Sequence, residues 1–127
     1  MKHIILIDDD SISNFVNSQL LLQTRFVEDV KSIESAEEAI EHFEKVKQGT
    51  EGLPDLVLVD IRMPVMDGFT LAEELLQRFP ELQGNVLFYF LSSSLDPKDE
   101  ERSNNHPLSS GFLRKPLSKA YIEQVFR

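Results

Sequence analysis

Four aspartates of this chain stand directly after short apolar runs. Three follow the run at 4–7 and one follows the run at 56–59: Asp8, Asp9, Asp10 and Asp60. Carboxylates that lie a few ångströms apart repel one another, and the repulsion raises their pKa values. A hard dication relieves it, and Mg²⁺ favours one or two carboxylates together with water and phosphate oxygens. If the fold brings these aspartates together, they predict a Mg²⁺ site.

Two further polar residues have a similar setting. Ser92 opens a serine triplet after a third apolar run, at 86–91, and Lys115 precedes Pro116 near the end of the sequence. A hydroxyl group can donate or accept a hydrogen bond, and an ammonium group can balance the negative charge of nearby carboxylates. Both residues therefore join the aspartates as candidates for one site.

The three apolar runs, at 4–7, 56–59 and 86–91, are typical of buried strands. They are apolar throughout and do not alternate, which is the pattern of strands that are covered on both faces of a parallel sheet. We predict two further short strands, at Phe26–Val30 and at Gly111–Arg114.

Apolar residues recur at helical spacing between these runs. A capping box at Ser35 and Glu38 begins one helix, which Gly49 ends. Pro80 closes another, and Pro97 suits the first turn of a weaker and short one. We expect helices that contain Phe15, Val16, Leu20 and Leu21; Ala39 to Val46; Phe69 to Leu76; the residues after Pro97; and those from a cap at Ser118 through Val125.

The alternation of strands and helices predicts an α/β fold with a doubly wound parallel sheet and helices on both faces. In such sheets, ligands bind beyond the carboxyl ends of the strands. That edge is where the predicted topology places the aspartates, the serine and the lysine.

The same residues resemble the receiver domain of two-component response regulators, in the CheY-like superfamily. The most specific segment is Leu-Val-Asp-Ile-Arg-Met-Pro-Val-Met-Asp-Gly at 58–68, and Asp8-Asp9, a hydroxyl at Ser92 and Lys115-Pro116 complete the set. The resemblance covers essentially the whole chain. It implies a flavodoxin-like sheet of five strands in the order 2-1-3-4-5. We expect one receiver domain over 1–127, of the stand-alone type, with no separate output domain.

The resemblance also implies a role for each matching residue. Asp60 would accept a phosphoryl group from a phosphohistidine, and Mg²⁺ would be held by Asp8, Asp9, Asp60 and the backbone carbonyl of Arg62. Ser92 and Lys115 would bind phosphoryl oxygens. Such a protein promotes its own phosphorylation and dephosphorylation and is not a conventional enzyme. Its expected partners are a sensor histidine kinase or a phosphotransfer protein, and a downstream protein that docks on the face of the fourth helix, fifth strand and fifth helix.

The conformational response is expected at Ser92 and Phe112. In the family, a hydroxyl moves toward the phosphoryl group and an aromatic ring on the fifth strand follows it. Here Ser92 replaces a frequent threonine, and Phe112 has no phenol hydroxyl. Arg62 and Ser94 stand where the family tunes the lifetime of the phosphoryl group. The coupling of site to surface is therefore less well specified than the site.

Composition and charge exclude several classes of partner. The chain has 127 residues with a formal net charge of -9, so no basic face for nucleic acid is expected. There is no cysteine, which excludes disulfides and thiolate chemistry. We find neither a signal peptide nor an apolar stretch of the roughly 18 residues that a membrane span needs. These features predict a cytoplasmic protein with no membrane partner.

Other interpretations remain for each motif. Asp8 to Asp10 could be a helix cap, Ser92 a turn residue, Lys115 a surface lysine and Phe112 ordinary core packing. The whole chain could be a receiver-like binding module that does not use phosphate. It could also be a Mg²⁺ phosphatase of the haloacid dehalogenase type, with Asp8 as nucleophile and Asp10 as acid, although that function leaves Asp60 unexplained.

Overall fold

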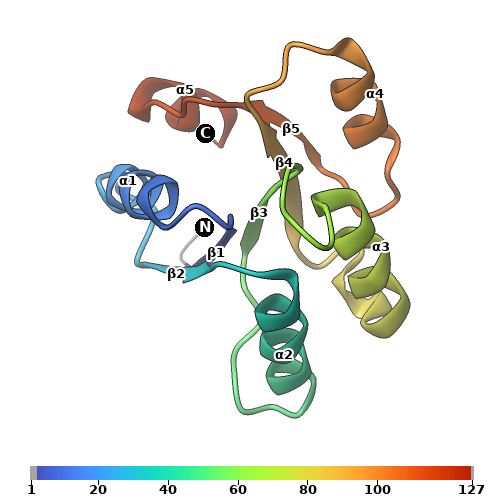
Figure 1. The fold of residues 1–127 in the computed structure, drawn as a ribbon. Coiled ribbons are helices and arrows are strands. Elements are labelled where there is room, and N and C mark those ends of the chain that lie inside the picture. The colour runs from blue at the N-terminus through green and yellow to red at the C-terminus, as the bar shows by residue number, and fades with distance from the viewer. Residues whose placement is uncertain (1–2, 127) are drawn as a thin grey trace.

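Parallel strands form a single sheet in the computed structural model, which describes residues 3–126 (Figure 1). Within those residues the sheet has five strands in the order β2-β1-β3-β4-β5. Their bounds are β1 His3–Ile7, β2 Asp29–Ile33, β3 Leu56–Asp60, β4 Leu87–Ser92 and β5 Gly111–Arg114. The predicted fold class and strand order are both confirmed.

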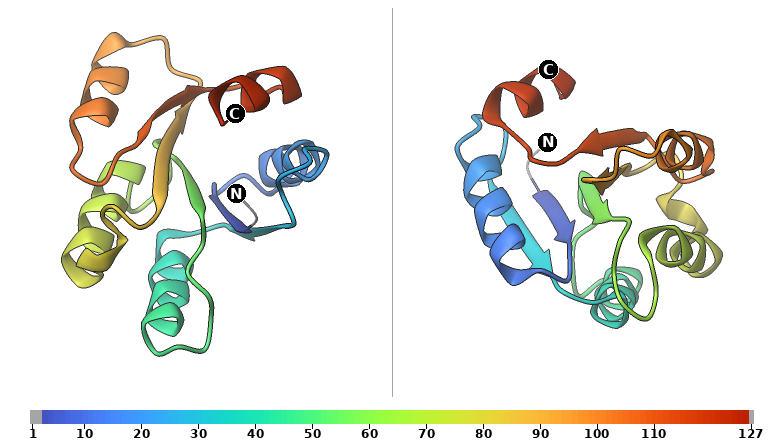
Figure 2. Two further views of the ribbon diagram at one scale, coloured as in Figure 1. Left: turned by 180° about the vertical axis from the view of Figure 1, so that it is seen from behind. Right: turned by 45° about the horizontal axis from the view of Figure 1, so that its top comes forward.

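Helices cover both faces of the sheet. They are α1 Ser11–Leu22, α2 Ala36–Lys47, α3 Gly68–Arg78, α4 Pro97–Asn105 and α5 Lys119–Val125, with a 3-10 turn at Pro80–Leu82 after α3. Helices α1 and α5 lie on one face, and α2, α3 and α4 lie on the other (Figures 1 and 2). Each α-helix begins after a side chain that accepts a hydrogen bond from a first-turn N–H group: Asp10, Ser35, Asp67, Asp96 and Ser118.

The core has two layers because successive side chains of a strand point to opposite faces. Ile5 and Ile7 of β1 join a cluster under α2 and α3, whereas Ile4 and Leu6 join a cluster under α1 and α5. Every residue of β3 is buried, so its apolar run has no alternation. This strand carries Asp60 as its last residue, one position beyond the predicted run.

The second strand was predicted too early in the sequence. The prediction placed it at Phe26–Val30, but β2 spans Asp29–Ile33. Val27 donates its N–H group to the carbonyl of Thr24 and so belongs to the turn after α1. Strand β2 lies at the border of the sheet beside β1 and is mostly exposed, so its polar residues carry no strand signal.

Helix α1 occurs where it was predicted, but it presents an unexpected face to the sheet. The buried side chains of α1 are Asn14, Asn17 and Leu21, while Phe15 and Val16 are exposed. The apolar residues that predicted the helix are therefore divided: Phe15 and Val16 point outward, whereas Leu21 is buried and Leu20 packs against the cluster under α1 and α5. Across the described part of the chain, no helix is long and apolar enough to cross a membrane.

Candidate functional site

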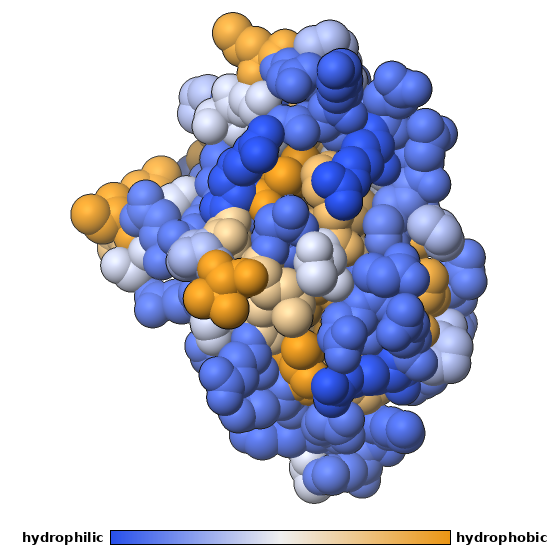
Figure 3. Space-filling model, turned by 45° about the vertical axis from the view of Figure 1, so that its right-hand side comes forward, coloured by the Kyte–Doolittle hydropathy of each residue, from blue (hydrophilic) through white to orange (hydrophobic). Residues whose placement is uncertain are grey.

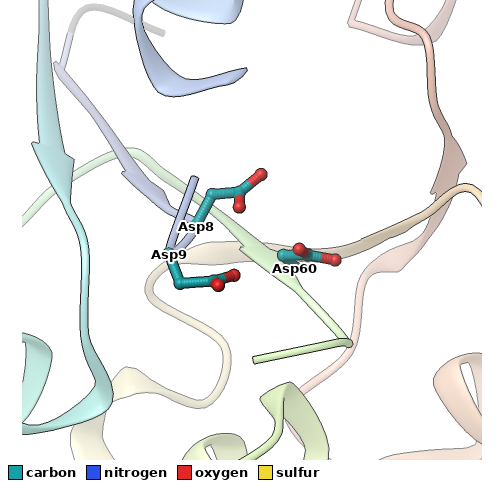
Figure 4. Close-up of side chains that lie close together, drawn as sticks. All are labelled: Asp8, Asp9 and Asp60. Atoms are coloured by element: carbon teal, nitrogen blue, oxygen red, sulfur yellow. The ribbon is translucent and has the colours of Figure 1, made fainter. Parts of the chain in front are cut away.

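Three aspartates meet at the carboxyl ends of β1 and β3, which are neighbours in the sheet (Figure 4). Asp8 and Asp60 are buried and Asp9 is exposed, and one carboxylate oxygen of each lies within 4.8 Å of the others. The pleat puts Asp8 and Asp60 on the face of α1 and α5, because each lies two residues beyond a core leucine of that face, Leu6 or Leu58.

Lys115 supplies the positive charge of this cluster. Its Nζ lies 2.5 Å from Oδ2 of Asp8 and 3.4 Å from Oδ2 of Asp60. Strand β5 ends one residue earlier, and the Lys115 N–H group donates to the carbonyl of Ser92 at 3.0 Å. The lysine is therefore held at the edge of the sheet, and it is not a free surface residue.

The electrostatics of the cluster favour a cation. Burial raises the pKa of Asp60 to about 6, and the neighbouring Asp8 adds to this rise while Lys115 opposes it. Burial by itself lowers the pKa of Lys115, but its hydrogen bond to Asp8 and the charge of Asp60 outweigh this effect and raise it. Three carboxylates against one ammonium group leave an excess of negative charge.

Backbone N–H groups fix two of the carboxylates. Oδ1 of Asp8 accepts from the N–H group of Asp10 at 3.0 Å, and Oδ1 of Asp60 accepts from that of Arg62 at 3.2 Å. Asn14, buried on α1, donates through Nδ2 to the carbonyl of Asp8 at 2.8 Å. Asn14 was not predicted as a site residue, because a polar residue within an expected helix gives no signal that it faces the core.

Close packing of β3 against α3 depends on Gly68. A Cβ atom at this position would lie 2.5 Å from the backbone oxygen of Asp60 and 3.0 Å from Cα of Ile61. The Gly68 N–H group donates to the carbonyl of Ile61 at 2.9 Å. Glycine thus lets the first turn of α3 lie directly against the segment that carries Asp60.

Arg62 connects the acidic cluster to helix α4. Its guanidinium group donates to Oδ2 of Asp99, in the first turn of α4, at 2.7 Å. For Arg62, the resemblance implied a backbone role at the metal site and a position that tunes phosphoryl lifetime. It gave no sign of Asp99 as a partner, because the two residues lie 37 positions apart.

Ser92 is a turn residue in this structure. It is buried, and its Oγ accepts from the N–H group of Ser94 at 2.9 Å, which is the hydrogen bond of a serine turn. The next hydroxyl, that of Ser94, accepts from the N–H group of Asp96 at 3.1 Å. Ser92 lies two residues after Phe90 and so belongs to the face of α2 and α3, opposite to the layer of Asp8.

Phe112 is half-buried in the same layer as Ser92. It pairs in register with Phe90, and its ring packs against the cluster under α2 and α3. The guanidinium carbon of Arg114 lies 5.3 Å from the centre of the Phe112 ring. Arg114 also donates to the carbonyl of Ser94 at 2.6 Å, so one arginine contacts both the ring and the loop after β4.

The donor set fits a hard dication. Asp8, Asp9 and Asp60 offer carboxylate oxygens at mutual distances that one ion could span, and oxygen ligands are those that Mg²⁺ requires. The cluster could therefore hold a metal ion.

The phosphatase alternative fits the geometry poorly. Both oxygens of Asp8 are engaged, one by Lys115 and one by the N–H group of Asp10. Oδ1 of Asp10 accepts from the N–H groups of Ile12 and Ser13 as the cap of α1. Asp8 is paired with a lysine, which does not suit a nucleophile. Asp10 serves as a helix cap, which does not suit a general acid.

Comparison with known proteins decides the family. The family model for the response regulator receiver domain matches residues 4–127 of this chain. This chain belongs to that family. Receiver domains are components of two-component signalling and are not conventional enzymes.

Individual relatives agree with this assignment. The response regulator receiver protein CpdR of Brucella abortus is 30% identical, over 92% of this chain and 91% of its own length. The transcriptional regulatory protein DegU of Brevibacillus brevis is 31% identical over 96% of this chain, which spans only 48% of DegU. This chain likewise spans half or less of several other curated relatives.

Solved structures show the same fold. A two-component response regulator from Cytophaga hutchinsonii superposes with a TM-score of 0.90 at 28% identity, covering 99% of this chain and 94% of that chain. A response regulator receiver protein from Dyadobacter fermentans superposes with a TM-score of 0.83 at 25% identity, covering 98% and 94%.

Proposed function

We propose that this receiver domain is a phosphorylation switch in which Asp60 accepts a phosphoryl group from a phosphohistidine in the presence of Mg²⁺. The observation that carries the proposal is the position of the Lys115 ammonium group between two buried carboxylates, 3.4 Å from Asp60. An anionic donor can approach an anionic acceptor only where positive charge offsets the repulsion.

Each residue has a part in the proposed reaction. Asp8, Asp9, Asp60 and the carbonyl of Arg62 would hold Mg²⁺. The ion would supply positive charge to the phosphoryl oxygens. A carboxylate oxygen of Asp60 attacks phosphorus, and the bond from phosphorus to the donor histidine breaks. Lys115 pairs with one phosphoryl oxygen, and the Ser92 hydroxyl donates to another after leaving its bond with Ser94.

Exposed apolar side chains near the acidic edge support docking of a protein donor. Ile12 and Phe15 on the first turns of α1 are 74% and 66% exposed, Val65 on the loop after β3 is fully exposed, and Leu95 on the loop after β4 is 85% exposed. Figure 3 shows hydrophobic side chains that project from a mostly hydrophilic surface, together with a band of hydrophobic side chains across the middle of this face. An acidic centre with apolar neighbours suits a donor that presents its phosphohistidine from an apolar surface.

The proposed output surface consists of α4, β5 and α5, where a downstream protein would dock. Ser92 and Phe112 lie in the same layer of the molecule, which supports a response that passes from the site to β5. On phosphorylation the Ser92 hydroxyl moves and the ring of Phe112 follows it. The populations of two packing arrangements then shift.

Acetyl phosphate with Mg²⁺ tests the chemistry without any partner. We expect a phosphoryl group on Asp60, located by mass spectrometry, and none in Asp60→Asn. An unlabelled protein, under conditions in which a control receiver domain is labelled, would favour a binding module that does not use phosphate. Hydrolysis of a phosphoester that needs Asp8 but survives Asp60→Asn would favour a phosphatase.

A further inference from the structure

Helix α4 is held against the protein by polar contacts. Its sequence, Pro-Lys-Asp-Glu-Glu-Arg-Ser-Asn-Asn, contains no aliphatic or aromatic side chain apart from the proline ring, and its buried residue is Ser103. A helix that is polar all round gains little from hydrophobic burial. Its attachment must therefore depend on hydrogen bonds, ion pairs and cation–π contacts.

Two arginines outside α4 bind its first turn. Arg62 donates to Asp99 at 2.7 Å, and the Asp99 side chain is only 13% exposed. Arg114 pairs with Glu100 at 3.3 Å, and both side chains are more exposed than that of Asp99. The two acids are adjacent, yet each pairs with a different arginine from a different strand end.

Arg62 is bound at both ends. Its backbone N–H group donates to the acceptor Asp60 at 3.2 Å, and its guanidinium group reaches α4. A phosphoryl group on Asp60 would place new, strongly accepting oxygens on the residue two positions before Arg62 in the sequence. Guanidinium groups form short, charge-assisted hydrogen bonds with phosphate, so the phosphoryl group competes with Asp99 for Arg62.

We propose that Asp99 is a positioning residue that keeps Arg62 on α4 until Asp60 is phosphorylated, when Arg62 exchanges Asp99 for the phosphoryl oxygens. The proposal rests on the proposed function and adds a route to α4 that does not use Ser92 or Phe112. The exchange breaks one ion pair of α4 and leaves Arg114 bound to Glu100. The first turn of α4 is then less restrained, and its surface becomes available to a partner.

Linkage gives the exchange a measurable signature. If the phosphoryl group and Asp99 compete for Arg62, then removal of the Asp99 carboxylate must strengthen binding of a phosphoryl analogue. The gain must equal the free energy that the analogue otherwise spends in breaking the Arg62–Asp99 pair. A merely structural aspartate would weaken that binding or leave it unchanged. The coupling must also require Arg62.

The test is a titration with beryllofluoride, a phosphoryl mimic, in the presence of Mg²⁺. We expect Asp99→Asn to bind it roughly two- to fivefold more tightly than the native chain, the range of a partly exposed ion pair. Glu100→Gln is the matched control: it removes the neighbouring carboxylate of the same turn, which pairs with Arg114, and we expect unchanged affinity. In an Arg62→Gln background, Asp99→Asn should have no further effect.

Hydrogen exchange of the amides of residues 98–105, measured with and without beryllofluoride and Mg²⁺, provides a second readout. Without ligand, Asp99→Asn and Glu100→Gln should both exchange faster there than the native chain, since each variant breaks one ion pair. Added beryllofluoride should speed exchange in the native chain and in Glu100→Gln, but not in Asp99→Asn. Equal tightening by Asp99→Asn with or without Arg62 would overturn the exchange and indicate simple charge repulsion. If the native chain binds no beryllofluoride at all, the proposed function fails as well.

Discussion

Asp60 is a carboxylate in a setting that disfavours its own charge. Burial and Asp8 raise its pKa from the ordinary 3.8 to about 6, although Lys115 lies 3.4 Å away. Such a group is unfavourable for stability when it is ionised, and a phosphoacceptor needs to be ionised in order to attack. The ionised Asp60 thus carries a local free-energy cost that a bound dication can relieve.

This cost predicts a pH-dependent stability that Asp60→Asn should abolish. Because the folded-state pKa is raised, the contribution of Asp60 to stability is fully present below about pH 4 and is lost as the pH rises through about 6. In metal-free buffer at pH 7.5 we expect Asp60→Asn to be more stable than the native chain by roughly 1–3 kcal/mol. Urea unfolding of both proteins at pH 4, 5.5 and 7.5 measures the difference, which should shrink toward zero at pH 4. A difference that is constant with pH would contradict the expected titration.

Lys115, in contrast to Asp60, stabilises the fold when it is charged, because its ammonium group balances the buried carboxylate of Asp8. The Asp8 side chain is 1% exposed and its Oδ2 lies 2.5 Å from Nζ of Lys115. Replacement by methionine would leave a buried carboxylate without its ammonium partner, so Lys115→Met should destabilise the fold by roughly 2–4 kcal/mol at pH 7.5. The exposed Lys119 on α5 provides the control, and Lys119→Met should change stability by less than about 0.5 kcal/mol. If Lys115→Met were as stable as that control, Lys115 would not be balancing Asp8.

The elements position these side chains through very close packing at one point. Helix α3 begins at Gly68, where a Cβ atom would lie 2.5 Å from the backbone oxygen of Asp60. Gly68→Ala should therefore displace the end of β3 or the start of α3, destabilise the fold by roughly 1–3 kcal/mol and weaken Mg²⁺ binding. Gly52→Ala is a suitable control, since its Cβ would meet no heavy atom within 4 Å. Urea unfolding and Mg²⁺ titration of both variants test this, and equal effects at the two glycines would refute it.

How much of this was predictable depends on where each element lies in the sheet. The buried strands β1, β3 and β4 were predictable to within a residue because both faces are apolar, and they place Asp8 and Asp60 correctly at one edge. Strand β2 at the border of the sheet was placed three residues too early, because an exposed strand has no apolar run. Burial on both faces therefore made the central strands easy to locate, whereas the two border strands differed: β2 was misplaced and the half-buried β5 was predicted at its observed bounds.

Side-chain partners are less predictable than elements. The sequence placed Arg62 next to Asp60, but the direction of its guanidinium group toward Asp99 depends on how α4 is docked. Likewise, the stripe with Phe15 and Val16 predicts a helix correctly, yet the side of α1 that meets the sheet carries Asn14. Here a polar bond to the loop of Asp8 determines the buried face, which no periodicity reveals.

At the scale of the whole molecule, Asp60, the proposed acceptor, lies at the carboxyl end of the middle strand of the sheet. Strand β3 is the middle of five strands, with α1 on one face and α4 on the other (Figure 1). A donor that docks on α1 therefore leaves α4 uncovered. Signal input and output can occupy different faces while they share the single edge that holds Asp60.

This separation predicts that donor docking and phosphoryl chemistry can be altered independently. Phe15 is 66% exposed on α1, so Phe15→Ser should change stability by less than about 0.5 kcal/mol and leave the reaction with acetyl phosphate unchanged. Transfer from a phosphorylated histidine phosphotransfer protein that serves the native chain should fall by about tenfold or more, as expected when an apolar interface anchor is lost. Leu53, exposed on the loop before β3 at the opposite edge of the sheet, gives the matched variant Leu53→Ser, which should transfer normally. If Phe15→Ser slowed phosphorylation equally with acetyl phosphate and with the phosphotransfer protein, Phe15 would contribute to the reaction itself. If Phe15→Ser and Leu53→Ser slowed transfer equally, α1 would not be the docking surface.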